Sequence, residues 1–307
     1  MYFGRRTEQV RKQKTYQIDL PDEVTPAADA LFRKKLASVV LKPGFRIPPI
    51  PGVVAELNRL SGNTTKLTDT VMALIERDAA LAGELLVRAR TAGIGTGKPL
   101  LDLPKAIRRM GPRRLIHWLL ELSRGEVFRS QLLHDLMKEQ YRHNFSVACA
   151  SAHLFQVLRL DSKKGFLCGL LHDIGHHAVL SGLATLGRTQ SGLLTPDGVR
   201  QAMMMHHGQI GAMVISMWKL PKLFSEVARY HDRPERAKLF KPVVNAVALA
   251  NAADKIKAED IRERTEMLGR LKLCYDIGLG KPEIRELAQV VEKARNERYL
   301  LSLINQK

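Results

Sequence analysis

Apolar residues recur at intervals of three and four along most of the chain, the spacing that lines one face of an α-helix. The first such segment starts at Thr25 and predicts a helix through Val40. The proline-rich segment 47–51 must end it, because proline lacks an amide hydrogen and clashes with the preceding turn. Amphipathic runs at 53–60, 67–75 and 81–89 predict further helices.

The same periodicity continues through the second half. A helix restarts at Leu101–Pro104, where proline suits the first turn, and Gly111-Pro112 ends it and starts another. Long helices are expected at about 133–158 and 162–182, then a looser segment at 187–197, then helices to the C-terminus. Strand-like alternation is absent from the sequence. We therefore predict an all-α fold, with the polar segment 123–131 joining two lobes.

The composition is that of a soluble globular protein, with 45% apolar and 26% charged residues. No stretch approaches the roughly 18 to 20 apolar residues that cross a bilayer, and the N-terminus has no apolar core of a secretory signal. We expect a cytoplasmic protein without membrane insertion. Cys149, Cys168 and Cys274 are too few and too scattered for a disulfide framework or a zinc cluster, so reduced core thiols are expected.

The charge balance is the unusual feature of the composition. Lys and Arg number 49 against 31 Asp and Glu, a formal net charge of +18. Such an excess favours an anionic partner, which could be an acidic protein surface, a nucleotide or a nucleic acid. The alternative is that the positive charge only keeps the protein soluble. Residues 1–25 are predicted to form a basic, mobile arm.

One short stretch concentrates the positive charge, with five basic residues in ten positions and no acid among them. Interleaved apolar residues place these charges on the solvated side of two short helices. Arginine binds phosphate or carboxylate through paired hydrogen bonds, so this basic face is a candidate anion- or partner-binding site; a merely solvated face is the alternative. The sequence has no phosphate-binding glycine loop and no nucleophile elbow, which argues against P-loop NTPases and α/β-hydrolases. The basic face comprises Lys105, Arg108, Arg109, Arg113 and Arg114.

The second half also carries an ordered series of histidines and aspartates. His172 and His176 are four residues apart, which would stack them on one face of a helix with Asp173 beside them. Imidazole and carboxylate together suit first-row divalent metals, such as manganese, iron or zinc. Buried, hydrogen-bonded histidines without a metal are the alternative explanation.

The segment Leu170–Gly175 resembles the metal motif of the HD superfamily. More specifically, the chain resembles the HDOD family from Phe45 to Asp254. The superfamily's ligand order implies that His143, His172, Asp173 and Asp254 bind metal, with His176, His207 and His231 serving a second metal or orienting the first ligands. The HDOD resemblance rests on four stretches: FRIPPIP at 45–51, ERDAAL at 76–81, AIRRMG at 106–111, and HGQIGA with WKLP at 207–221.

This resemblance implies a helical bundle built from an N-terminal helical lobe at 26–125 and an HD-like lobe at 130–258. Residues 259–307 are expected to form a C-terminal helical extension. It also implies a role in bacterial signalling, where most HDOD proteins are regarded as regulatory modules.

This chain differs from the HD-superfamily proteins that cleave cyclic dinucleotides, and these differences decide which hypothesis comes first. His176 stands where those relatives have lysine, and the segment 232–235 lacks their glycine-tyrosine-proline loop. Arg90-Thr91 also replaces the family's Asn-Ser. The first hypothesis is therefore a regulatory protein that binds a partner or a nucleotide. The second is a metal-dependent phosphohydrolase acting on a nucleotide or cyclic dinucleotide. The oligomeric state and the identity of the ligand stay open.

Overall fold

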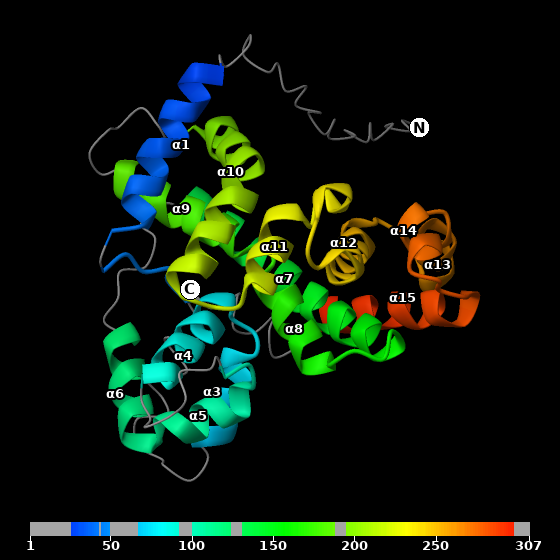
Figure 1. Ribbon diagram of the computed structural model, residues 1–307, viewed down its shortest axis with the longest axis horizontal. Coiled ribbons are helices and arrows are strands. Elements are labelled where there is room, and N and C mark those ends of the chain that lie inside the picture. Colours follow the sequence, from blue (N-terminus) through cyan, green and yellow to red (C-terminus); the bar gives the residue numbers. More distant parts are fainter. Residues whose placement is uncertain are drawn as a thin grey trace, which may run out of the picture.

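The computed structural model describes residues 26–42, 44–49, 67–91, 100–123, 131–187 and 195–297. Within these ranges the regular structure is helical and no strand occurs, so the predicted all-α fold is confirmed (Figure 1). The N-terminal part contains α1 (Pro26–Val40), α3 (Leu67–Ile75), α4 (Ala79–Thr91), α5 (Leu103–Met110) and α6 (Pro112–Ser123). The remainder contains α7 (Gln131–Val157), α8 (Ser162–Leu171), α9 (Ile174–Gly187), α10 (Pro196–Met217), α11 (Lys222–Tyr230), the 3₁₀ turn η1 (Pro234–Arg236), α12 (Lys241–Lys255), α13 (Ile261–Gly269), α14 (Lys272–Asp276) and α15 (Lys281–Arg295).

Helix α5 shows how local sequence sets the boundaries in the N-terminal part. The Asp102 side chain accepts a hydrogen bond from the amide of Lys105, and Pro104 occupies the first turn, where its missing amide has no cost. Gly111 ends the helix with a φ of 74°, a conformation that residues with a Cβ rarely adopt. Helices α3 to α6 pack together at the lower left of Figure 1.

Helix α1 packs away from these helices although it precedes them in the chain. It lies against α9 and α10, where Leu36 and Val40 contact the face of α9 at Gly182 (Figure 1). Both side chains are buried. From Pro26 on, the predicted helix ending at Val40 is thus present, and it packs on two of the helices that carry the histidine series.

The single helix predicted over 162–182 is wrong, because the chain breaks into α8 and α9 at His172-Asp173. The amide of His176 donates to the carbonyl of Asp173, three residues back instead of four, which ends the α-helical register. Leu170, Leu171 and Ile174 are buried on both sides of the break. The apolar periodicity continues without interruption across this break, so the sequence pattern does not reveal it.

Close helix packing holds α9 against α10 immediately after this break. A Cβ on Gly175 would lie 1.9 Å from the carbonyl oxygen of His207, so only glycine permits the observed approach. Gly211 of α10 faces Gly175 across the same contact. Helices α7 and α8 form another closely packed pair, and Gly169 lies against the backbone of α7 at Val147.

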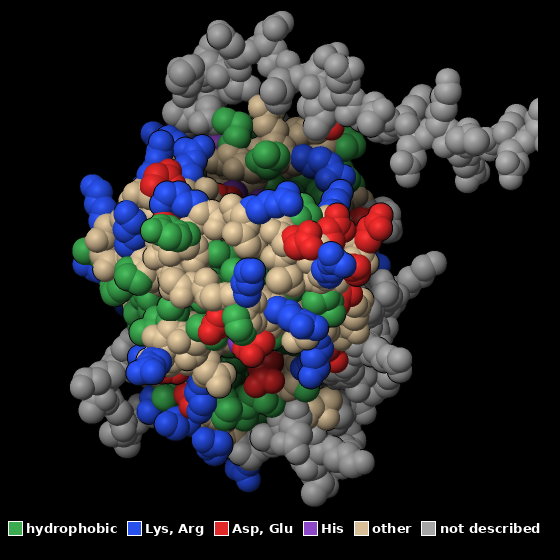
Figure 2. All heavy atoms as spheres, turned by 90° about the vertical axis from the view of Figure 1, so that its right-hand side faces the viewer, with side chains coloured by type: hydrophobic (Ala, Val, Ile, Leu, Met, Phe, Trp, Pro, Cys, Tyr) green, Lys and Arg blue, Asp and Glu red, His purple; other side chains and the backbone are tan. Residues whose placement is uncertain are grey.

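The C-terminal helices α13 to α15 form the right-hand side of Figure 1. Helix α15 packs along α7 and contacts α12, while α13 packs on α15. Acidic and basic side chains intermingle on the face seen from this side (Figure 2). Among the described helices, none is both long enough and apolar enough to cross a bilayer.

The three cysteines are free; Cys168 and Cys274 are buried and Cys149 is partly buried. The expected arm at 1–25, the helix at 53–60, and most of the segments 123–131 and 187–197 lie outside the described residues. The lobe boundaries stay predictions.

Candidate metal centre

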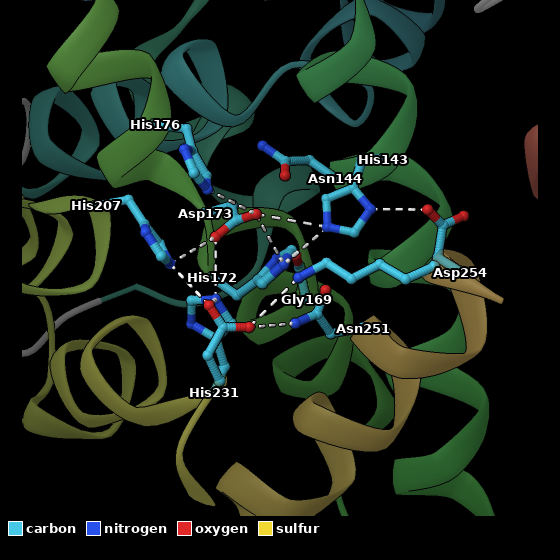
Figure 3. A network of polar contacts seen from close by, with 12 residues as sticks. His143, Asn144, Gly169, His172, Asp173, His176, His207, His231, Asn251 and Asp254 are labelled. Atoms are coloured by element: carbon cyan, nitrogen blue, oxygen red, sulfur yellow. Dashed lines mark hydrogen bonds and ion pairs between the residues drawn. The ribbon is translucent and has the colours of Figure 1, made fainter. Parts of the chain in front are cut away.

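Six histidine and aspartate side chains from different helices point toward one another in the second lobe (Figure 3). The break between α8 and α9 places Asp173 at the middle of the group. Both oxygens of its carboxylate face histidine nitrogens, and the residue is 2% exposed. The contributing residues are His143 of α7, His172 and Asp173 at the break, His176 of α9, His207 of α10 and His231 after α11.

One set of donor atoms lies on the Oδ2 side of Asp173. The Nε2 atoms of His143 and His172 are 3.2 Å apart, and each lies 3.4 Å from Asp173 Oδ2. Nε2 of His176 lies 3.6 Å from the same oxygen. Two ligands about 2.1 Å from one metal are separated by about 3.0 Å in octahedral and about 3.4 Å in tetrahedral geometry. The spacing of this first set therefore matches the edges of a coordination polyhedron.

A second set lies on the Oδ1 side of the same carboxylate. Nε2 of His231 is 3.0 Å and Nε2 of His207 is 3.8 Å from Asp173 Oδ1. Asp232 adds an oxygen, because its Oδ2 lies 3.0 Å from His207 and 3.5 Å from His231. Asp173 is thus shared by two groups of potential metal ligands.

Backbone carbonyls fix the orientation of three histidine rings. Nδ1 of His172 donates to the carbonyl of Gly169 at 2.7 Å, and Nδ1 of His207 donates to that of Met203 at 2.8 Å. Nδ1 of His231 donates to the carbonyl of Ala228 at 3.1 Å. A carbonyl only accepts, so Nδ1 carries a proton in each ring, and in His172 and His231 this leaves the lone pair of Nε2 for the centre. This is how metal-binding histidines are held in proteins. Nε2 of His207 instead donates a hydrogen bond to Asp232 Oδ2 at 3.0 Å.

Asp254 occupies a different place from the one expected. Its Oδ2 accepts a hydrogen bond from Nδ1 of His143 at 2.7 Å, at the outer edge of that ring (Figure 3). The structure thus brings His143, His172, Asp173 and the three further histidines together, and it sets Asp254 behind His143. In this position Asp254 fixes the orientation of the His143 ring.

The unpaired polar atoms of the centre test whether a metal fits. Asp173 Oδ1 and His231 Nε2 are buried and have no hydrogen-bond partner among the described residues, although they lie 3.0 Å apart. Because Nδ1 of His231 carries the ring proton and donates it to a carbonyl, its Nε2 has no hydrogen to give to Asp173. Buried polar atoms without partners are costly, and a cation between them removes that cost. The nitrogen and oxygen donors suit a first-row divalent ion.

The electrostatics of the group also suit a cation. Burial lowers the pKa of His172 well below its usual range and that of His176 to about 3, so both rings are neutral, as metal ligation requires. Burial would raise the pKa of Asp173, but its contacts with the surrounding histidines, the hydrogen bond from His143 included, hold it well below the usual value. Burial also opposes protonation of His143, yet hydrogen bonds to Asp173 and Asp254 raise its pKa to about 9.

The centre is most open on the side of Asp232, whose side chain is 43% exposed, against 1% for His231. Asp232 Oδ1 accepts a hydrogen bond from Asn251 at 3.0 Å and lies 3.3 Å from Nζ of Lys255. Sequence reasoning missed Asp232, Asn251 and Lys255 as members of the site. The signal for Asp232 was present, because it follows His231 as Asp173 follows His172.

The basic face lies on other helices, on α5 and α6, and all five of its residues are exposed. The interleaved Ile107, Met110 and Leu115 are buried. The prediction that these charges form the solvated side of two short helices is confirmed. An anion-binding role for them stays a prediction.

An all-helical bundle with a histidine–aspartate cluster at a helix break defines a protein of the HD type. The chain belongs to the HDOD domain family, whose model matches residues 47–234. The chain is 28% identical over 270 residues to an uncharacterised protein of Treponema pallidum, covering 85% of this chain and 52% of the relative. It therefore spans about half the length of that relative.

Two solved structures share the fold. The MmoQ response regulator from Methylococcus capsulatus is 18% identical, with a TM-score of 0.60 over 80% of this chain and 98% of that one. A virulence factor from Campylobacter jejuni is 13% identical, with a TM-score of 0.55 over 86% of this chain and 97% of that one. At these identities the likeness establishes the fold alone. The family match and the shared fold together establish an all-helical HDOD protein.

Proposed function

We propose that this protein is a signalling module that binds a phosphorylated ligand of the nucleotide class at a divalent metal centre. The observation that carries the proposal is the sharing of Asp173 between two groups of donors, one on each carboxylate oxygen. Purely structural histidines would satisfy one another with hydrogen bonds. Here Asp173 Oδ1 and His231 Nε2 are buried without such partners among the described residues.

The two donor groups assign different residues to each ion. His143, His172 and Asp173 would hold the first, and His207 and His231 would hold the second together with Asp173. Divalent ions in such a site polarise phosphoryl oxygens and neutralise their charge. Asp232 contributes a further carboxylate at the exposed side.

Lys255 supports a phosphate as the group that is recognised. Its side chain is 55% exposed and its Nζ lies 3.3 Å from Asp232, at the open side of the centre. Lysine serves as a mobile point charge for phosphate. A phosphate that approaches the metals from the side of Asp232 would pass within reach of Lys255.

The experiment that tests this proposal compares Asp173→Asn with wild type after growth in medium supplied with manganese, iron or zinc. Metal analysis of the purified proteins is expected to find bound metal in wild type and to find it lost in the variant, since Asn cannot bridge two ions as a carboxylate does. Asp197→Asn is the matched control, because Asp197 is exposed in the first turn of α10. Metal-free wild type, or equal metal in all three proteins, contradicts the proposal.

Hydrolysis of the ligand is a second candidate function, favoured by the shared carboxylate. Two ions that share a carboxylate flank both the attacking and the leaving oxygen in two-metal phosphohydrolases. His176 argues against cyclic dinucleotides as substrates, because its neutral ring, stacked on His207, does not supply the positive charge of the lysine that the cyclic-dinucleotide-cleaving proteins resembling this chain have there. Phosphate release from nucleotides by metal-loaded wild type, absent from Asp173→Asn, would establish turnover; binding without release would leave recognition as the function.

A further inference from the structure

The C-terminal helices reach the candidate metal centre at the end of α12. Asp254 lies in the last turn of this helix, where backbone carbonyls have no partner within the helix. Two arginines from the following helices supply partners at this point: Arg264 from α13 and Arg295 from α15. Both helices follow residue 234, where the match to the HDOD family model ends.

Arg264 anchors the backbone on both sides of Asp254. It is 4% exposed, and its Nη1 donates to the carbonyls of Ala253 at 3.0 Å and Ile256 at 2.8 Å. Its Nη2 lies 3.6 Å from Glu292 of α15. A cation at a helix C-terminus is also favoured by the helix dipole. Arg264 therefore fixes the end of α12 and ties α13 to α15.

Arg295 acts on Asp254 itself. Its Nη1 donates to the backbone carbonyl of Asp254 at 2.7 Å and lies 3.0 Å from the carboxylate Oδ1. The other carboxylate oxygen accepts the hydrogen bond from Nδ1 of His143 at 2.7 Å. On the far side of that ring, Nε2 lies 3.4 Å from Asp173 Oδ2. A continuous chain of contacts thus runs from α15 to the centre.

We propose that Arg295 is a positioning residue of the metal centre, acting through Asp254 on His143; this inference rests on the proposed function. One carboxylate oxygen is held by Arg295 and the other by His143, so the carboxylate cannot rotate without losing a contact. Without Arg295 the Oδ1 side of the carboxylate loses its ion pair, and only His143 and Ser146 still hold it, so it fixes the direction of His143 Nε2 less firmly. The C-terminal extension is thereby part of the site.

Titration of metal-free protein with Mn²⁺ tests this role. Arg295→Ala is expected to weaken binding by about 10-fold or more, the usual effect of removing a group that orients a metal ligand. Arg295→Lys keeps the charge and is expected to recover much of the affinity. Lys293→Ala is the control, because Lys293 is exposed on the same helix two residues earlier. Wild-type affinity in Arg295→Ala overturns the inference, as does an equal loss in Lys293→Ala.

A second measurement separates failure of this inference from failure of the proposed function. The ring resonances of His143 in metal-free protein, assigned with a His143→Gln variant, report the environment of its Nδ1 directly. They are expected to shift in Arg295→Ala and to stay unchanged in Lys293→Ala. If wild type binds no metal, the proposed function fails and this shift alone decides the inference. Unchanged resonances in Arg295→Ala overturn it whether or not metal binds.

Discussion

Asp173 combines deep burial with a negative charge, which is an unfavourable pairing unless cations compensate it. Removing an ionised carboxylate from water costs several kcal/mol. Around Asp173 the compensation comes from histidines on both oxygens, and for His143 hydrogen bonds to Asp173 and Asp254 outweigh burial and raise its pKa to about 9. Because those histidines must be neutral to bind metal, a divalent ion and a proton compete for the same place.

Lys255 provides a prediction that separates ligand binding from metal binding. Replacing it with Ala is expected to weaken the binding of inorganic phosphate to metal-loaded protein several-fold, since a cation at the open side is lost. The metal content is expected to stay that of wild type, because Nζ of Lys255 forms an ion pair with Asp232 and not with Asp173. Lys257→Ala serves as the control, since Lys257 is exposed nearby on the chain. Phosphate affinity equal to wild type in Lys255→Ala removes this residue from the site.

The sequence could predict the histidines and Asp173 because a motif marks them and the resemblance orders them. It could not predict that Asp254 lies behind His143, because ligand order along a chain does not state which oxygen faces which ring. The sequence could not identify Lys255 and Arg295 as members of the site for another reason. Each reaches the site through packing between helices distant in sequence, and nothing local distinguishes them from other surface cations.

At the scale of helices, the contact between α9 and α10 determines whether the two donor groups can share Asp173. Gly175→Ala is expected to force these helices apart, since the new Cβ would lie 1.9 Å from the carbonyl oxygen of His207. We expect a loss of unfolding free energy of about 1–3 kcal/mol, typical of overpacking, together with loss of bound metal. Gly269→Ala is the control, because a Cβ there meets nothing within 4 Å. Urea denaturation of both variants measures the difference; equal stability would show that the backbone contact is dispensable.

Helix α5 carries a pH-dependent contribution to stability. The hydrogen bond from Lys163 holds the pKa of Asp102 below its ordinary value, so Asp102 stabilises the protein above that range and the contribution disappears as the pH falls through its folded pKa. Asp102→Ala is expected to cost about 1 kcal/mol at neutral pH through loss of the helix cap. In urea denaturation its deficit should shrink in acid. Asp102→Asn keeps a capping oxygen, so a deficit as large as that of Asp102→Ala would contradict the capping role.

Within the described residues, helix existence was predictable because apolar spacing records burial directly. The single helix expected at 162–182 shows the limit of that signal. Ile174 and Leu171 are buried on either side of a break that only the hydrogen-bond pattern reveals. The path of α1 onto α9 was equally hidden, because spacing identifies the buried face of a helix and not what covers it.

At the scale of the whole molecule, the net charge of +18 raises the question of where an anionic partner would bind. The basic face is exposed, so we predict that replacing Arg108, Arg109 and Arg113 with Gln weakens binding of a polyanion probe, such as a labelled single-stranded oligonucleotide. Binding should also fall steeply with added salt, as counterion release requires. Fold stability should change little, because surface substitutions rarely exceed about 0.5 kcal/mol.

A second triple variant serves as the control. It differs from the first only in where the three positive charges are removed. Arg262, Arg270 and Arg285 are exposed on the C-terminal helices, and replacing them with Gln removes the same total charge. If both triple variants bind the probe equally, the overall charge and not the basic face accounts for binding.

The central claim is that Asp173 is shared by two divalent ions. The most direct measurement is a crystal structure of the protein grown with Mn²⁺, with the ions located by their anomalous scattering. We predict two peaks about 3.5–4 Å apart, one beside each oxygen of Asp173, with His143 and His172 on one and His207 and His231 on the other. A map without peaks at Asp173, with the histidines hydrogen-bonded to one another in their place, would contradict the account.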